Sequence, residues 1–325
     1  MFILGLQGSP RKKGNTSILL STFLDEAEKL GARTRSLDIV SMNISPCLEC
    51  GVCEREGFCP IEDDMCMIYP LLRKADIIVL ASPVFFYGPP AQMKALIDRC
   101  QVLWARKYVH RLIDPGEKWR RGLLLSVGAT KGKKLFDGIC LTAKYFFDAV
   151  GVNFDGALAY RQIEAEGEIA KHPTALSDAR EKAGTLARPF LERKKIFFIS
   201  RNDDCCSQMA SAFARYHAGN RLEPESAAII PAEDINPIAR KVMAEKGIDM
   251  AFRKPGSIDE ALANQSPELI ISMACKEACR RFSPDVEIRE WNLPDASEKT
   301  LPVMRQLRDD IECKVKEELW YDSGF

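Results

Sequence analysis

The sequence lacks a net charge and lacks any long apolar run. Its 46 basic residues balance 46 acidic ones, so no overall field directs the chain to nucleic acid or to an anionic membrane surface. The longest apolar stretch, residues 77–86, is interrupted by Ser82 and Pro83 and is too short to span a bilayer. The apolar residues 2–6 are too few for a secretory segment and have no basic flank before them. We therefore expect a cytoplasmic protein with no membrane and no nucleic-acid partner.

Histidine is scarce, whereas cysteine is abundant. Three histidines stand against twelve cysteines, so metal chemistry here must rest mainly on sulfur. In a chain with no sign of secretion, this cysteine content favours cofactor ligation over disulfides. Cys47, Cys50, Cys53 and Cys59 follow the spacing C-x2-C-x2-C-x5-C, which places four thiolates on one short segment. This donor set predicts a [4Fe–4S] cluster, and a four-sulfur zinc site or unliganded or oxidised thiols are the alternatives.

The alternation of short β-rich runs with amphipathic segments predicts two α/β domains. In the first half, strands are expected at 2–7, 34–39, 77–81, 122–127 and 157–160, and helices at 16–30, 92–104, 133–150 and 175–191. This order is typical of a doubly wound parallel sheet with right-handed crossovers. The pattern restarts near residue 195, with strands at 196–199 and 268–273 and helices at 207–218, 236–246 and 301–319. We place the domains at 1–192 and 193–325, the second being a smaller α/β parallel-sheet domain.

A polar loop follows the first strand and leads directly into a helix. It reads Gly-Ser-Pro-Arg-Lys-Lys-Gly-Asn-Thr-Ser over residues 8–17. Free backbone N–H groups and the positive end of the helix dipole favour a phosphate there, and hydroxyl and amide side chains complete the cradle. The loop matches neither the P-loop pattern nor G-x-G-x-x-G, so ATP and a Rossmann dinucleotide fit poorly. An ordinary capped helix start is the alternative for this loop taken alone.

A second loop, residues 82–90, follows another strand and carries three adjacent aromatic residues. Phe85, Phe86 and Tyr87 lie outside any β-alternation, and prolines on both sides hold the segment irregular. A planar ligand is expected where such a loop leaves the carboxyl edge of a parallel sheet. A packed aromatic cluster is the alternative. A third loop, residues 126–130, leaves the next strand toward the same edge.

These loops resemble those of the flavodoxin-like NADPH-dependent FMN reductases. The similarity lies in Gly-Ser-Pro-Arg at 8–11 with Asn-Thr at 15–16, in Ser-Pro-Val-Phe at 82–85 and in Lys-Ala-Leu-Ile-Asp-Arg at 94–99, and it spans about residues 1–190. The cysteine run further resembles their iron–sulfur flavoprotein branch. The resemblance implies a flavodoxin-like fold, an FMN cofactor, and redox work as a homodimer or homotetramer with the flavin near a subunit interface.

The same resemblance assigns roles to residues of the three loops. It implies that the first loop holds the FMN phosphate, the second lines the isoalloxazine ring, and the third lies near the other edge of the ring. The phosphate residues would be Ser9, Arg11, Asn15 and Thr16, and the ring residues Pro83, Val84, Phe85 and Phe86, with Gly128 and Ala129 opposite. With neighbouring residues of the same loops, the expected set also includes Ser17, Tyr87 and Gly88.

From residue 195 the chain resembles the low-molecular-weight tyrosine phosphatase and arsenate reductase family. The similar pieces are 196–200, 207–210, 236–237, 242–243 with 247–249, and 291–295. Active members carry C-x5-R after the first strand, but here Ser200 stands at the nucleophile and Cys206 at the arginine. Asp203 and Asp204 add negative charge to the loop, and Asp295, at the place of the general acid, has no nucleophile to serve. We therefore expect neither phosphatase nor arsenate reductase activity.

A second sulfur site is a further hypothesis. Cys205 and Cys206 follow one strand of this domain, and Cys275 and Cys279 follow another. Both loops are expected at the same edge of the parallel sheet, so the four thiols could converge on a second cluster or metal. An empty vestigial loop is the alternative.

The sequence as a whole predicts an FMN-dependent oxidoreductase that passes electrons between FMN, a [4Fe–4S] cluster and a redox partner. The electron donor would be a carrier such as ferredoxin or NAD(P)H. An NAD(P)H:FMN reductase without a cluster and a redox-sensing flavoprotein are the alternatives.

Overall fold

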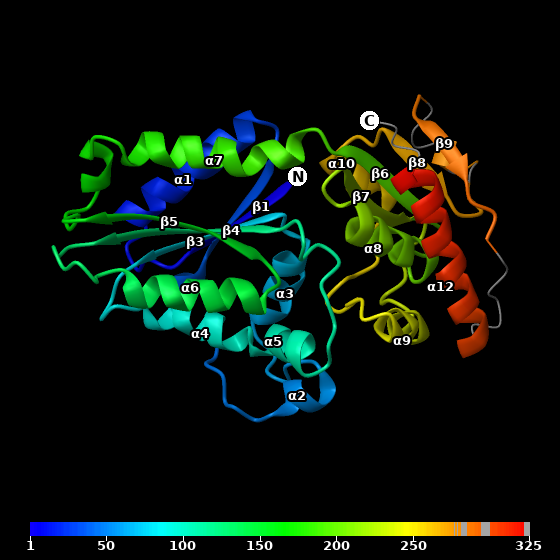
Figure 1. Cartoon of the computed structure of the whole chain (residues 1–325), viewed down its shortest axis with the longest axis horizontal. Helices are drawn as coiled ribbons and strands as arrows, with labels where there is room; N and C mark the ends of the chain where they lie inside the picture. The colour runs from blue at the N-terminus through cyan, green and yellow to red at the C-terminus, as the bar shows by residue number, and fades with distance from the viewer. Residues whose placement is uncertain (276, 278, 281–284, 294–299, 322–325) are drawn as a thin grey trace. The chain divides into compact units, whose positions relative to one another are not determined.

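The computed structural model describes residues 1–275, 277, 279–280, 285–293 and 300–321 (Figure 1). The chain forms two compact units. Unit 1 comprises Met1–Arg111 and Glu117–Leu191, and unit 2 comprises Leu112–Gly116 and Glu192–Phe325. Within the described part of the chain, no helix is both long and apolar enough to cross a membrane.

Unit 1 is built on a five-stranded sheet in which every pairing is parallel. The strand order is β2-β1-β3-β4-β5, the order of flavodoxin-type doubly wound sheets, and it confirms the predicted fold class. The central strands are continuous apolar runs because helices cover both faces of the sheet. The strands are β1 (Phe2–Gln7), β2 (Arg33–Asp38), β3 (Ile77–Pro83), β4 (Arg121–Gly128) and β5 (Asn153–Arg161).

Helices α1 and α7 cover one face of this sheet, and α3 to α6 lie on the other (Figure 1). The single helix predicted over 92–104 is wrong, because two helices meet at Cys100. At this junction the Tyr69 hydroxyl donates to the Arg99 carbonyl at 2.9 Å. The helices are α1 (Asn15–Lys29), α2 (Val52–Glu56), α3 (Met65–Lys74), α4 (Ala91–Arg99), α5 (Gln101–Tyr108), α6 (Asp137–Ala149) and α7 (Ala175–Leu191), with short turns η1 (Ile39–Ser41) and η2 (Glu168–Lys171).

Unit 2 contains a four-stranded parallel sheet in the order β7-β6-β8-β9. The two edge strands, residues 222–228 and 287–290, were not predicted from the sequence. The first contains Pro224, and the second begins and ends with a glutamate. Edge positions tolerate such residues, since one side of the strand needs no ladder partner. The strands are β6 (Lys194–Ser200), β7 (Leu222–Ala228), β8 (Leu269–Ser272) and β9 (Glu287–Glu290).

Two apolar clusters lie on opposite faces of this sheet. Phe198 belongs to the larger cluster and Phe197 to the smaller one, as alternation along β6 requires. The chain segment Leu112–Gly116 also belongs to unit 2: Ile113 N–H donates to the Gly247 carbonyl at 2.7 Å, and Asp249 N–H donates to the Ile113 carbonyl at 2.8 Å. The helices are α8 (Cys206–Ala218), α9 (Pro237–Glu245), α10 (Ile258–Asn264) and α12 (Leu301–Val315), followed by the π-helical turn η3 (Lys316–Tyr321).

Candidate functional site

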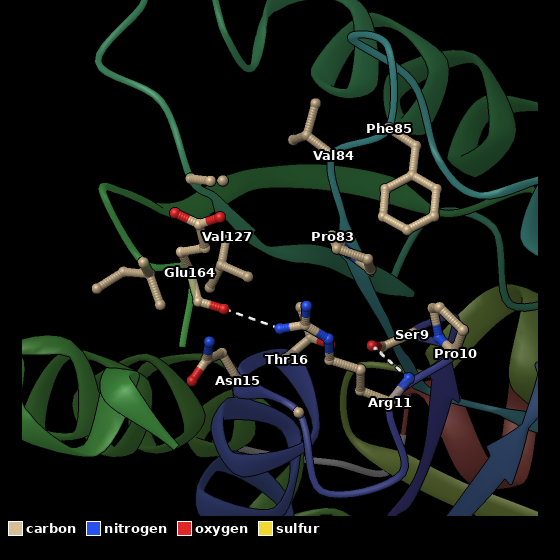
Figure 2. Close-up of a pocket in the computed structure, with 14 residues that line it drawn as sticks. Ser9, Pro10, Arg11, Asn15, Thr16, Pro83, Val84, Phe85, Val127 and Glu164 are labelled. Atoms are coloured by element: carbon tan, nitrogen blue, oxygen red, sulfur yellow. Dashed lines mark hydrogen bonds between the residues drawn. The ribbon is translucent and has the colours of Figure 1, made fainter. Parts of the chain in front are cut away.

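A cavity of about 210 Å³ lies at the carboxyl ends of β1, β3 and β4 in unit 1 (Figure 2). The three loops singled out from the sequence all contribute to it, and the segment after β5 closes one side. This is the edge at which doubly wound sheets bind their ligands. The lining residues are Ser9, Pro10, Arg11, Gly14, Asn15, Thr16, Pro83, Val84, Phe85, Val127, Gly128, Ala129, Ile163 and Glu164.

The loop between β1 and α1 presents the start of α1 to this cavity. Gly14 occupies the N-cap position of α1, and no described side chain caps the first turn. The N–H groups there remain available to an anion, and the helix dipole favours one. Ser9 and Thr16 are buried beside them, and a Cβ built on Gly14 would lie 3.2 Å from the Ser9 hydroxyl oxygen. The backbone, the hydroxyl groups and the missing side chain together suit a phosphate.

Arg11 and Asn15 hold the segment after β5 against this loop. The Arg11 guanidinium donates to the Glu164 carbonyl at 2.8 Å, a bond drawn in Figure 2. The Asn15 amide donates to the Ala165 carbonyl at 2.8 Å, and its oxygen accepts from Ile169 N–H at 3.1 Å. Both ends of the Asn15 amide therefore bond the backbone of the segment after β5. These bonds fix the side of the cavity that Ile163 and Glu164 line.

The loop after β3 forms a tight hairpin at the mouth of the cavity. Phe85 and Gly88 exchange two backbone hydrogen bonds of 2.9 and 3.0 Å around a two-residue turn. The turn residues Phe86 and Tyr87 both have positive φ, as a type I′ turn requires. Phe86 is fully exposed and Tyr87 is exposed, so the tip projects away from the lining that Pro83, Val84 and Phe85 provide. Of the expected residues, Ser17, Phe86, Tyr87 and Gly88 are absent from the described lining.

The four clustered cysteines line a second, larger cavity of about 760 Å³. It shares none of its described lining residues with the first cavity. Left-handed backbone at Glu49, Gly51 and Gly57 turns the cysteine segment around the cavity. Cys47, Cys50, Cys53 and Cys59 are free thiols. The donor set suits an iron–sulfur cluster, although no group of three or more such side chains in the described residues is arranged to hold a metal ion.

The prediction that the four cysteines of unit 2 meet at one site is wrong. The Cys205 thiol lies 3.9 Å from the Met304 sulfur in the larger apolar cluster, and Cys206 packs against the same cluster. Cys275 and Cys279 belong to the smaller cluster on the opposite face of the sheet, where their sulfur atoms are 3.7 Å apart. The hydrogen bond from the Cys279 thiol lowers the pKa of Cys275 to about 6, whereas the pKa of Cys279 is raised.

The loop after β6, at the place of the phosphatase nucleophile, is filled by its own side chains. The Ser200 hydroxyl accepts from Asp203 N–H at 3.0 Å and lies 2.8 Å from the Ser207 hydroxyl. Ser207 in turn donates to the Asp203 carboxylate at 2.6 Å. Burial raises the pKa of Asp203 to about 6 despite these hydrogen bonds. Asp295, the expected counterpart of the general acid, lies outside the described residues.

Sequence comparisons assign both units to families. Residues 1–134 match the sequence model of the NADPH-dependent FMN reductase family. Arsenate reductase 2 of Staphylococcus haemolyticus is 30% identical to the chain over 129 residues, which cover 39% of this chain and 96% of that protein. The chain belongs to the arsenate reductase family through its second unit. Its first unit carries the FMN reductase domain.

Iron–sulfur flavoproteins are relatives of this FMN reductase domain. One from Methanocaldococcus jannaschii is 40% identical over 103 residues, covering 32% of this chain and 53% of that protein. Another from Methanosarcina thermophila is 37% identical over 131 residues, covering 40% of this chain and 65% of that protein. The chain thus spans only about half to two thirds of the length of these relatives.

Proposed function

We propose that the chain is an FMN-dependent oxidoreductase in which unit 1 binds FMN and a [4Fe–4S] cluster and exchanges electrons with a redox partner. The observation that carries the FMN assignment is the cavity at the carboxyl edge of the sheet, with an uncapped helix N-terminus at one end and an apolar wall at the other. The FMN reductase family and the iron–sulfur flavoprotein relatives support it. An NAD(P)H-type donor fits the family, and ferredoxin remains the other candidate.

The residues of the first cavity would divide the work of binding. Ser9, Thr16 and the first N–H groups of α1 would hold the phosphate. Pro83, Val84 and Phe85 would form the apolar wall that excludes water from the ring. Bound FMN would supply electron exchange in pairs with a nicotinamide donor and singly with a cluster.

The cysteine cavity would hold the cluster through Cys47, Cys50, Cys53 and Cys59. The donor chemistry and the shared cavity support this, as do the names of the relatives. The thiols are not gathered closely enough to form a metal site among the described residues, which favours one alternative: an NAD(P)H:FMN reductase without a cluster.

We propose that unit 2 has no phosphatase or arsenate reductase activity. Ser200 replaces the thiol nucleophile, and its hydroxyl is held between Asp203 N–H and Ser207. Cys206 provides no cation at the position of the oxyanion-binding arginine. We propose domain boundaries of 1–192 and 193–325 for the chain.

The test is to quantify FMN, iron and acid-labile sulfide on the same anaerobically purified full chain. We expect about four irons and four sulfides per FMN. Cys53→Ser should lose iron, whereas Cys66→Ser should keep it, because Cys66 is an exposed thiol outside the described lining of the cavity. FMN without iron would support the cluster-free reductase, and a chain that binds no FMN would refute the proposal.

A further inference from the structure

Arg99, the last residue of α4, joins the two ends of the cysteine segment. Its guanidinium donates to the Ser45 carbonyl at 2.9 Å and to the Ile61 carbonyl at 3.2 Å, and these residues flank the four cysteines on either side. It also forms a two-pronged ion pair with Asp63, with N–O distances of 2.5 and 3.2 Å. Asp63 accepts from Ser45 N–H at 2.9 Å, so one cation and one carboxylate close the segment. We call Ser45, Ile61, Asp63 and Arg99 the loop neck.

The loop neck is built inside the protein. The side chains of Arg99 and Asp63 are 0% and 2% exposed, so water screens this pair little. The charge and hydrogen bonds of Arg99 outweigh burial and lower the pKa of Asp63. A Lys side chain would keep the charge but could not bond both carbonyl groups and the carboxylate in one plane.

Arg99 also lies near the cysteines. It is among the residues that border the cavity of Cys47, Cys50, Cys53 and Cys59, and its charge interacts with the Cys59 thiol. Its Nε–H is buried and has no hydrogen-bond partner among the described residues. Because a buried donor without a partner is unfavourable, the guanidinium is held in place by its four bonds within the loop neck and not by Nε.

We propose that Arg99 is the positioning residue of the cluster site. It holds the cysteine loop closed and sets the charge beside the cluster, and Asp63 balances that charge. The inference rests on the proposed function, because it names the residue pair that tunes the proposed cluster. A cluster with four thiolates is an anion and becomes more negative when it is reduced. A buried cation therefore favours the reduced state, and an unbalanced carboxylate opposes it.

The first experiment tests closure of the loop in metal-free full-length protein. Each thiol is alkylated with iodoacetamide under anaerobic conditions, and its rate is followed by peptide mass spectrometry. We expect Arg99→Lys to raise the rates at the partly buried Cys53 and Cys59 at least tenfold, with no change at the exposed Cys313. Arg120→Lys is the matched control, since Arg120 is also buried in unit 1 and bonds backbone carbonyls away from the cysteines. Equal rates in the wild type and Arg99→Lys, or equal increases in both variants, would overturn the closure.

The second experiment measures the midpoint potential of the cluster after anaerobic loading with iron and sulfide. Arg99→Gln should lower the equilibrium constant for reduction of the cluster about tenfold, which lowers the midpoint potential by about 59 mV for a one-electron couple. Asp63→Asn should raise the midpoint potential by a similar amount. A purely structural role would reduce iron content in both variants without opposite shifts in potential. Iron bound normally at an unchanged potential would overturn this inference alone. A wild-type chain that takes up no iron would instead refute the cluster in the proposed function, and the tuning role with it.

Discussion

The buried carboxylate of Asp203 gives a stability prediction that can be worked out from the structure. Asp203 is fully buried, and burial raises its pKa from 3.8 to about 6. Because the folded value lies above the unfolded one, the group favours folding below about pH 4 and loses that contribution as the pH rises through 6. Each pH unit between the two values is worth about 1.4 kcal/mol, so ionised Asp203 destabilises unit 2 by about 3 kcal/mol above pH 7.

Asp203→Asn removes this charge and keeps the shape of the side chain. An Asn oxygen can accept the bonds now made by Gln208 at 2.9 Å and Gly256 at 3.1 Å, and its amide can donate to Ser207. Asn also suits the left-handed backbone at this residue, where φ is 52°. We therefore expect the variant to be more stable than the wild type at pH 8 by about 1–3 kcal/mol, and to lose the decline in stability between pH 4 and 7.

Hydrogen exchange of the central strand β6, followed by mass spectrometry on the full chain, measures this free energy for unit 2 alone. Exchange rates at pH 5 to 8 are corrected for the intrinsic rate of each amide. Asp204→Asn serves as the control, because Asp204 is the neighbouring carboxylate and is partly exposed. If Asp203→Asn and the wild type show parallel pH profiles, burial does not raise the pKa of Asp203.

Three further predictions concern the cavity mouth and the thiol pair. A Cβ on Gly138 would lie 2.5 Å from the Tyr87 carbonyl oxygen, so Gly138→Ala should displace the hairpin. We expect this variant to bind FMN at least tenfold more weakly in a fluorescence titration. The control is Gly184→Ala, which should leave the affinity for FMN unchanged because no described heavy atom lies within 4 Å of its Cβ. Replacing Phe86-Tyr87 by Asn-Gly should stabilise unit 1 by about 1–2 kcal/mol in thermal unfolding, since both residues have positive φ, and an unchanged melting temperature would show that the turn is not strained. The alkylation rate of Cys275 should rise with pH to a plateau, with a midpoint near pH 6. Cys279→Ala should move that midpoint to higher pH because the hydrogen bond from Cys279 is lost. A midpoint near pH 9 in the wild type would show that Cys279 does not lower the pKa of Cys275.

Much of the fold follows from patterns that are local in the sequence. Strands β1 and β3 are continuous apolar runs between helical segments, so their position and the parallel sheet could be predicted. Strand β9, with the sequence Glu-Ile-Arg-Glu, could not, because its identity comes from pairing with β8 at the edge of the sheet. The break at Cys100 could not be predicted either, because the helical pattern continues on both sides of it.

Some lining residues of the first cavity could likewise be predicted from the sequence, and others could not. Ser9, Thr16 and Pro83 follow predicted strands, and the structure places them around one cavity because parallel strands end at a common edge. Ile163 and Glu164 were missed, since the hydrogen bonds of Asn15 and Arg11 bring their segment there. The outward turn at Phe86 depends on backbone angles that aromatic residues seldom adopt.

The segment Leu112–Gly116 gives this protein an order of assembly. Its partners Gly247 and Asp249 are translated long after it, so Ile113 leaves the ribosome with its backbone bonds unmade. All of unit 1 is synthesised before those partners exist, whereas the five residues Leu112–Gly116, which interrupt unit 1 in the sequence, must wait for unit 2. A chain synthesised only as far as residue 246 therefore contains all of unit 1 but not the backbone partners of this segment.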